Sequence, residues 1–247
     1  MFVAINKGKA RRVNVNGLDV SWRALYQRSE DLVTAVVWSR LAYLSPNTLQ
    51  TLLSKLCPEI DSALGELQDI ELWPYWSVAT KSGASTANDT VQKYEPDVVL
   101  HFADWILIVE AKRVNEDNYQ DATQWQNYLQ SAQTLYPNKR QALLAVGGLG
   151  ERPSEFVQTL IEQQPDSFRD IPINGVSWQQ FYQLISEFAE YSHAGERILL
   201  RDLCDAMRAN GVTAYRDFHS LLDWRALSPS FSLQAEKTIR EFSQWDK

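Results

Sequence analysis

Two apolar segments of the chain carry charged residues at one end, and side chains of these types can bind a metal ion or take part in catalysis. The first, Tyr94–Leu100, reads YEPDVVL, and the second, Trp105–Lys112, reads WILIVEAK. Because successive side chains of a strand point to opposite faces, Glu110 and Lys112 share one face of a predicted strand. Charged groups at the end of a buried strand are costly unless they are paired or hold a metal ion.

The two segments have the spacing of an antiparallel hairpin that turns at residues 103–104. A two-residue loop pairs Val99 with Ile108 and Asp97 with Glu110, and a four-residue loop gives the same register. Residues directly opposite each other have Cβ atoms about 4.5–5.5 Å apart on one face. Ala-Asp is a poor dipeptide for a type I′ turn, and an odd-length loop or a bulge would shift the register by one residue. The hairpin register therefore predicts that two carboxylates face each other.

Adjacent carboxylates beside an ammonium group are typical of metal-assisted phosphoryl chemistry. Two neighbouring carboxylates resist being ionised together unless a cation lies between them. Mg²⁺ uses one or two carboxylates together with waters and phosphate oxygens. Lys112 is then placed to orient or activate a water, or to neutralise charge in a phosphoryl transition state. The structural alternative is that Asp97 caps a turn after proline and that Glu110 and Lys112 lie at a solvated strand end with a cross-strand ion pair.

The elements that must position these residues alternate between helix and strand. Apolar periodicity and capping residues predict helices over residues 29–41, 47–57, 121–136, 154–163 and 178–191, with Ser29 and Ser177 as N-caps. Besides the hairpin, strands are expected over residues 70–78, 142–146 and 173–176. This order predicts an α/β fold with a mixed central sheet flanked by helices, in which a meander comes first and crossovers follow.

The remaining segments flank or interrupt this core, which is expected to span residues 1–191. Residues 1–20 are predicted to be a short extended segment, with a basic cluster that is either a solvated tail or a contact for nucleic-acid backbone (Lys7, Lys9, Arg11 and Arg12). Residues 81–90 are small and polar, which predicts a loop. Residues 192–247 show only helical patterns, over 195–209, 213–222 and 232–245, and are expected to form a helical C-terminal subdomain.

The charged motifs resemble those of the PD-(D/E)XK nuclease superfamily, which has the restriction-endonuclease-like fold. Pro96-Asp97 matches the PD element, and Glu110-Ala111-Lys112 matches the (D/E)XK element. The resemblance covers roughly residues 28–190 as an architecture. It implies one or two divalent metal ions held by Asp97, Glu110 and the backbone carbonyl of Ala111, with Lys112 as the catalytic lysine.

The same resemblance implies two further elements. An acidic residue on the helix before the sheet completes the metal shell, and Glu30 matches it, with Asp31 as the competing choice. The structural alternative for Glu30 is a first-turn acid that stabilises the helix dipole. A Q-x-x-x-Y element of the RecB-like branch matches Gln124 and Tyr128, which lie on one helical face. Both residues, together with Arg113, are expected to contact phosphate.

The loop over residues 81–93 is expected to lie along the cleft that admits the nucleic-acid strand. Lys81 and Lys93 stand at its two ends, where their charges could contact the backbone. His101 shares a strand face with Asp97 but lies four residues away, about 13 Å at the rise of a strand. It is therefore expected to be a residue of the hairpin tip rather than a metal ligand.

The composition of the chain excludes some classes of function. With 24 basic and 31 acidic residues the net charge is −7, which argues against a protein that coats nucleic acid with its whole surface. Cys57 and Cys204 are expected to be buried free thiols in a reducing compartment, with a single disulfide as the alternative. No zinc-ligand spacing, signal peptide or membrane-spanning run is present, so a cytoplasmic protein without a membrane partner is expected.

The sequence thus predicts a nuclease that uses Mg²⁺, with Mn²⁺ as a substitute, and hydrolyses phosphodiester bonds, most simply in DNA. The rival prediction is a catalytically silent module that keeps the nuclease fold and binds partners. A homodimer, or a protein partner held by the helical C-terminal region, is compatible with either prediction.

Overall fold

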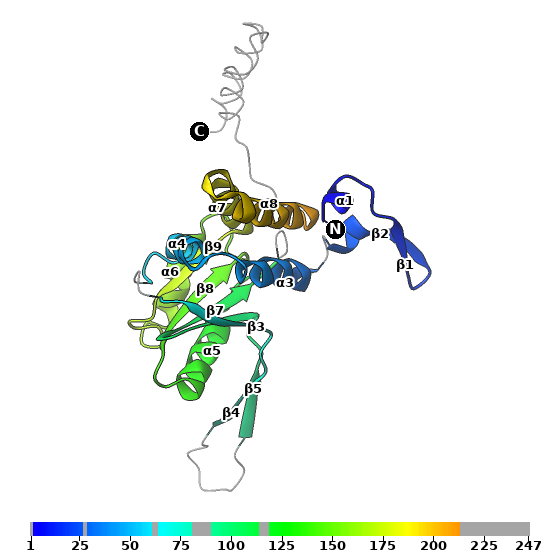
Figure 1. Ribbon diagram of the computed structural model, residues 1–247. Helices are drawn as coiled ribbons and strands as arrows, with labels where there is room; N and C mark the ends of the chain where they lie inside the picture. The colour runs from blue at the N-terminus through cyan, green and yellow to red at the C-terminus, as the bar shows by residue number, and fades with distance from the viewer. Residues whose placement is uncertain (1, 27–28, 61–63, 81–89, 114–118, 213–247) are drawn as a thin grey trace, which may run out of the picture. The chain divides into compact units, whose positions relative to one another are not determined.

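The computed structural model describes residues 2–26, 29–60, 64–80, 90–113 and 119–212 (Figure 1). The chain divides into two compact units, residues 1–213 and 214–247, and all described residues belong to the first. The helices predicted over residues 213–222 and 232–245 lie outside the described residues. So does the greater part of the loop predicted over residues 81–90.

A five-stranded mixed sheet forms the centre of the first unit, in the order β3-β6-β7-β8-β9. The strands are β3 (Leu67–Leu72), β6 (Val98–Phe102), β7 (Trp105–Ala111), β8 (Arg140–Val146) and β9 (Ile173–Val176). β3, β6 and β7 pair antiparallel, whereas β7, β8 and β9 pair parallel. The predicted α/β class, with a meander followed by crossovers, is confirmed.

The β6–β7 hairpin has the register that the sequence predicts. Val99 pairs with Ile108, and the strands are joined by the two residues 103–104. Every side chain of β6 and β7 is buried. A register slip of one residue would turn the whole apolar set of each strand to the opposite face, so the pattern of a buried hairpin specifies its pairing strongly.

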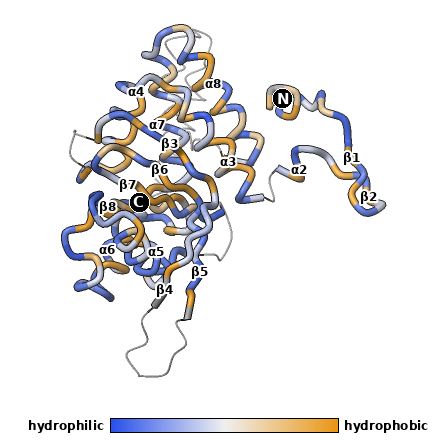
Figure 2. The backbone as a smooth tube through the Cα atoms, turned by 60° about the horizontal axis from the view of Figure 1, so that its bottom comes forward, coloured by the Kyte–Doolittle hydropathy of each residue, from blue (hydrophilic) through white to orange (hydrophobic). Residues whose placement is uncertain are grey.

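Helices cover both faces of the sheet (Figure 1). They are α3 (Glu30–Leu41), α4 (Pro46–Leu56), α5 (Ala122–Leu135), α6 (Pro153–Gln163), α7 (Trp178–Tyr191) and α8 (Ala194–Ala209). α5 and α6 pack on one face, where Trp125 and Val157 join Val99 and Ile108 in one apolar cluster. α3, α4 and α7 lie on the other face. The apolar stretches of the chain accordingly gather along the central strands and the helix faces that meet them (Figure 2).

Serine and aspartate caps define where the main helices begin. The Ser29 and Ser177 side chains accept hydrogen bonds from the backbone N–H groups of Leu32 and Gln180, so both predicted N-caps are confirmed. Asp121 caps α5 in the same way. Pro46 occupies the first turn of α4, where its missing N–H costs nothing.

The single strand predicted over residues 70–78 is wrong. The chain turns at Trp73-Pro74, where Trp73 has a φ of 51° and proline has no N–H to donate to a sheet. β3 therefore ends at Leu72, and β4 (Trp76–Thr80) leaves the central sheet. It pairs antiparallel with β5 (Thr90–Tyr94), which takes up residues that were expected to belong to a loop.

The N-terminal residues form a helix, a hairpin and a second helix instead of the predicted extended segment. The elements are α1 (Phe2–Asn6), β1 (Arg12–Val15), β2 (Leu18–Ser21) and α2 (Trp22–Tyr26). Asn16 and Gly17 form the turn with φ values of 51° and 84°, as a type I′ turn requires. An Asn-Gly pair between alternating residues is a strong hairpin signal, and it predicts this turn without any tertiary information.

α8 confirms the helix expected over residues 195–209. It packs against α7, and its Asp202 forms an ion pair with Arg40 of α3 at 3.0 Å. The domain boundary predicted after residue 191 falls between α7 and α8, inside the first unit. Cys57 and Cys204 are buried free thiols. No helix within the described ranges is long and apolar enough to cross a membrane.

Candidate active site at the strand ends

Glu110 is the most unusual side chain of the sheet, because it is a carboxylate that is only 2% exposed. It follows the apolar run of β7 on the face that packs against α5, two residues after Ile108. Its Oε1 accepts a hydrogen bond from Nζ of Lys112. Its Oε2 is buried and has no hydrogen-bond partner among the described residues. A buried carboxylate oxygen without a donor is expensive, and it is available to a cation.

Asp97 lies directly before β6, next to the end of β7. Its Oδ2 accepts a hydrogen bond from the backbone N–H of Ala111 at 2.8 Å. Its own carbonyl accepts one from the backbone N–H of Trp73 at 3.0 Å. The two contacts fix Asp97 between β3 and β7, and the hairpin register carries it to the position opposite Glu110.

The pKa values of these groups reflect burial and like charge. Burial and, after it, the charge of Asp97 raise the pKa of Glu110 from 4.5 to about 7, although Lys112 acts in the other direction. Burial also raises the pKa of Asp97, and the Ala111 N–H and Lys112 oppose that change. Burial lowers the pKa of Lys112, but the surrounding carboxylates, Glu110 above all, outweigh it and leave the pKa raised. The ammonium ion is therefore retained while the carboxylates resist ionising.

Glu30 begins α3 beside its Ser29 cap and joins the same electrostatic group. Burial raises its pKa, Lys112 lowers it, and Asp97 raises it again. The neighbouring Asp31 is exposed, whereas Glu30 is half-buried. Three carboxylates from separate parts of the chain thus act on one lysine.

Gln124 and Tyr128 lie one helical turn apart on α5, and their side chains contact each other beside this group. Gln124 Nε2 donates to the Tyr128 hydroxyl at 2.7 Å, and that hydroxyl donates to the Glu95 carbonyl at 3.1 Å. The Tyr128 hydroxyl also lies near enough to the Glu110 carboxylate to lower its pKa, although its hydrogen bond goes to the Glu95 carbonyl and not to Oε2 of Glu110. Arg113 follows directly after Lys112, and its backbone N–H lowers the pKa of Glu30. The predicted metal ligands, catalytic lysine and phosphate contacts therefore lie around the start of β6 and the end of β7, whereas Lys81, predicted at one end of the cleft loop, lies outside the described residues.

Gln120 supports the site, and nothing in the sequence pattern singled it out. Its buried side-chain Nε2 donates to the backbone carbonyls of Glu110 and Gly147, each at 3.1 Å. Its Oε1 accepts a hydrogen bond from Trp125 Nε1 at 2.9 Å. A single amide thus ties the end of β7 to the end of β8 and to α5, which holds the backbone beneath Glu110.

Gly147 and Trp178 position the backbone of Lys112. Trp178 Nε1 donates to the Lys112 carbonyl at 2.7 Å. Gly147 has a φ of 72°, and a Cβ atom there would lie 2.3 Å from that same carbonyl oxygen. The Gly147-Gly148 pair reads in the sequence as an ordinary strand-to-helix turn, so the signal was visible although its link to Lys112 was not.

The donor set fits a metal ion that shares its shell with a substrate. Among the described residues, no group of three or more His, Cys, Asp or Glu side chains forms a metal site by itself. Mg²⁺ does not require one, because it commonly uses one or two carboxylates with waters and phosphate oxygens. Asp97 and the orphaned Oε2 of Glu110 are of this kind, and the Ala111 carbonyl is the third donor that the sequence predicts.

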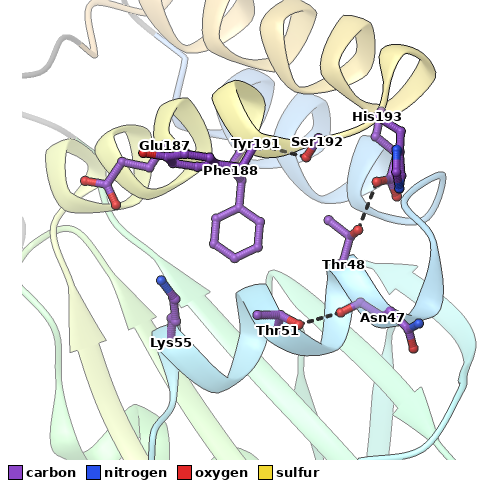
Figure 3. A pocket seen from close by; sticks show the side chains of 10 residues that line it. Asn47, Thr48, Thr51, Lys55, Glu187, Phe188, Tyr191, Ser192 and His193 are labelled. Atoms are coloured by element: carbon purple, nitrogen blue, oxygen red, sulfur yellow. Dashed lines mark hydrogen bonds between the residues drawn. The ribbon is translucent and has the colours of Figure 1, made fainter.

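A cavity of about 390 Å³ lies apart from these residues, between α4, α7 and the start of α8 (Figure 3). The Phe188 ring points from α7 toward α4, and Lys55 Nζ lies 5.4 Å from its centroid. Glu196 accepts hydrogen bonds from Ser45 N at 2.8 Å and from the Thr48 hydroxyl at 2.9 Å. The Glu196 carboxylate on the rim of this cavity thus has partners within the protein, unlike Oε2 of Glu110.

Comparison with known proteins finds a relative of similar extent. The uncharacterized protein PM0110 of Pasteurella multocida (strain Pm70) is 29% identical over 193 residues, which cover 75% of this chain and 71% of the relative. No family model matches the chain. The name of this relative states no activity.

Proposed function

We propose that this protein is a metal-dependent nuclease of the PD-(D/E)XK type that hydrolyses phosphodiester bonds in DNA. One observation carries the proposal: a buried Glu110 that faces Asp97, is held by Lys112 and keeps one oxygen without a partner among the described residues. A purely structural ion pair would not need a second carboxylate whose charge raises the pKa of the first.

The proposed roles follow from the contacts. Asp97, Glu110 and the Ala111 carbonyl hold the metal ion, and Glu30 completes its shell directly or through a water. When bound, Mg²⁺ supplies charge neutralisation and polarises a phosphate oxygen. Lys112 keeps its proton, because its pKa is raised, and positions the attacking water or contacts a phosphate oxygen. Gln124, Tyr128 and Arg113 border the place where the phosphate would enter.

The arrangement of the sheet supports the same proposal. The proposed restriction-endonuclease-like core has its acidic residues on neighbouring strands, with a helix before the sheet and a helix after the second strand. Here α3, the β6–β7 hairpin and α5 stand in that order. The sheet order alone carries no function, since one fold can serve many activities.

The test is cleavage of linear duplex, circular duplex and single-stranded DNA, and of an RNA of equal length, by the full chain. Activity is expected with Mg²⁺ or Mn²⁺ and not with EDTA. Lys112→Ala is expected to lower the rate by about 100-fold or more, since it removes a charge aimed at the transition state. Lys55→Ala, an exposed lysine beside the separate cavity, serves as the matched control and should retain activity.

The second candidate is a catalytically silent binding module with the same core. It is favoured by the Tyr128 hydroxyl, which is engaged with the Glu95 carbonyl rather than open to a phosphate. Absence of cleavage of every substrate by the folded wild-type chain, with either metal ion, would support this candidate and refute the nuclease.

A further inference from the structure

Positive charge is concentrated at the N-terminus of an otherwise acidic chain. Residues 1–28 contain six basic side chains and one acidic side chain, Asp19. This segment thus carries a net charge of +5 in a chain of net charge −7, which leaves −12 for the other residues. Such an asymmetry along a chain indicates a segment that meets an anionic partner.

The β1–β2 hairpin has no core of its own. Its strands pair from Arg12 with Ser21 to Val15 with Leu18, and no side chain of either strand is buried. A two-stranded hairpin without a packed face is marginally stable in water. The Asn16-Gly17 turn stabilises it, and most of its side chains are exposed.

Most of the basic side chains around this hairpin are exposed. Lys7, Lys9, Arg11 and Arg23 are exposed and form no ion pair with any residue in the described ranges. Arg12 differs, because its guanidinium contacts the carboxylate and the carbonyl of Asp19 at 3.5 and 2.6 Å. Four cations therefore stand in solvent between residues 7 and 23.

The segment is anchored at its base. Phe2 and Ile5 of α1 are buried in a cluster with Ala206 and Ala209 of α8. Asn6 Nδ2 donates to the Asp205 carbonyl at 2.7 Å. The basic side chains thus follow a helix, α1, that is packed onto α8. This packing lowers the entropic cost of ordering these side chains when a partner binds.

We propose that residues 7–23, the basic hairpin segment, bind the phosphate backbone of DNA. The inference rests on the proposed function, because it names how the same enzyme holds its substrate outside the strand-end site. Lysine and arginine contacts to phosphate position a protein without reading sequence. Trp22 is 38% exposed beside Arg23 and offers a ring on which an unpaired base can stack.

An anionic membrane surface is the other partner that such charge could attract. Binding of that kind needs a broad apolar face that enters the lipid, and the segment exposes Val15, Leu18 and Trp22 as its large apolar side chains. They are scattered over β1, β2 and α2 rather than aligned on one long helix. The observations therefore favour nucleic acid.

The test is binding of labelled single-stranded and duplex DNA to the full chain in EDTA, by fluorescence anisotropy over a series of KCl concentrations. The variant is K7Q/K9Q/R11Q, and the matched control is K55Q/R152Q/R169Q, which removes the same charge from exposed positions elsewhere. The first should raise Kd about 10-fold or more and reduce the slope of log K against log salt by about 2–3. The control should shift Kd far less.

Equal effects of the two triple variants, no effect of either, or no binding of DNA by the wild type would overturn the proposal. So would binding to phosphatidylserine vesicles that depends on the segment when DNA binding does not. If DNA binding depends on the basic hairpin segment but no DNA is cleaved, the nuclease proposal alone is refuted. If DNA is cleaved but its binding does not depend on the segment, the proposal for the segment alone is refuted.

Discussion

The β6–β7 hairpin carries buried ionisable groups at both of its ends, and the two ends are built on opposite principles. At the open end, Glu110 and Asp97 bring like charges together beside Lys112. At the turn end, His101 is 8% exposed, and its Nε2 lies 3.5 Å from a carboxylate oxygen of Glu71. The expectation that His101 is a residue of the hairpin tip fits this position.

Burial disfavours the charged form at both ends, but the neighbours differ. Burial raises the pKa of Glu110, and Asp97 adds to that change. Burial lowers the pKa of His101, and Glu71 opposes that change. The turn end thus pairs a base with an acid, His101 with Glu71, whereas the open end concentrates three carboxylates around Lys112. A site that is to bind a cation needs such an excess, and a structural pair does not.

The largest expected difference between the two ends is in catalysis. Glu110→Gln keeps the shape of the side chain but removes a proposed metal ligand, and we expect it to reduce DNA cleavage by about 100-fold or more. His101→Gln should leave the rate within the order of magnitude of the wild type. Initial rates measured with Mg²⁺ on the same DNA compare the two, and equal losses would contradict the functional distinction between the ends.

The second difference concerns stability against pH without metal. The folded-state pKa of Glu110 lies above its ordinary value, so its contribution to stability is fully present below pH 4.5 and is lost as pH rises to about 7. Glu110→Gln should therefore gain about 3 kcal/mol relative to the wild type across this interval. Urea unfolding in EDTA at both limits measures it. A constant difference between the two proteins would show that Glu110 ionises normally.

Metal binding at the open end of the β6–β7 hairpin should stabilise the protein against unfolding, and the turn end should not contribute. Free Mg²⁺ at about ten times its Kd is expected to add about 1.4 kcal/mol, or roughly 3 °C in the melting temperature. Asp97→Asn should abolish this shift, because it removes a ligand charge at the open end. Glu71→Gln, at the turn end, is the control and should retain it. A wild-type melting temperature that does not respond to Mg²⁺ or Mn²⁺ would contradict the metal site.

The smallest effect expected is the pH dependence of stability that His101 causes, and its sign is opposite to that at Glu110. Its folded-state pKa lies below the ordinary 6.5, so its contribution to stability is present above pH 6.5 and is lost as pH falls. His101→Gln should lose less stability than the wild type upon acidification. Glu71 opposes the shift, so the difference should be smaller than the one at Glu110. Urea unfolding on both sides of pH 6.5 tests the sign, and steeper acid destabilisation of the variant would contradict it.

Local sequence patterns predicted the structure correctly where neighbours in sequence are also neighbours in space. The hairpin register followed from two apolar runs and the length of their loop, which brought Asp97 opposite Glu110. The N-terminal turn is equally local, yet the segment around Asn16-Gly17 was expected to be extended, and that expectation is wrong. The prediction of a single strand over residues 70–78 is wrong for another reason. Pro74 is compatible with an edge strand, and only the left-handed conformation of Trp73 shows that the strand ends there.

The sequence by itself determined the α/β class, the strand that ends in Glu110 and Lys112, and the residues around it, because alternation, caps and loop length act over short distances. Tertiary structure alone decided how that strand end is held. Gln120 reaches Gly147 across 27 residues, and Trp178 reaches the Lys112 carbonyl across 66. It also decided that Glu110 is buried with one unpartnered oxygen within the described residues. Burial and hydrogen-bond satisfaction depend on what the fold packs around a residue, and no local pattern records that.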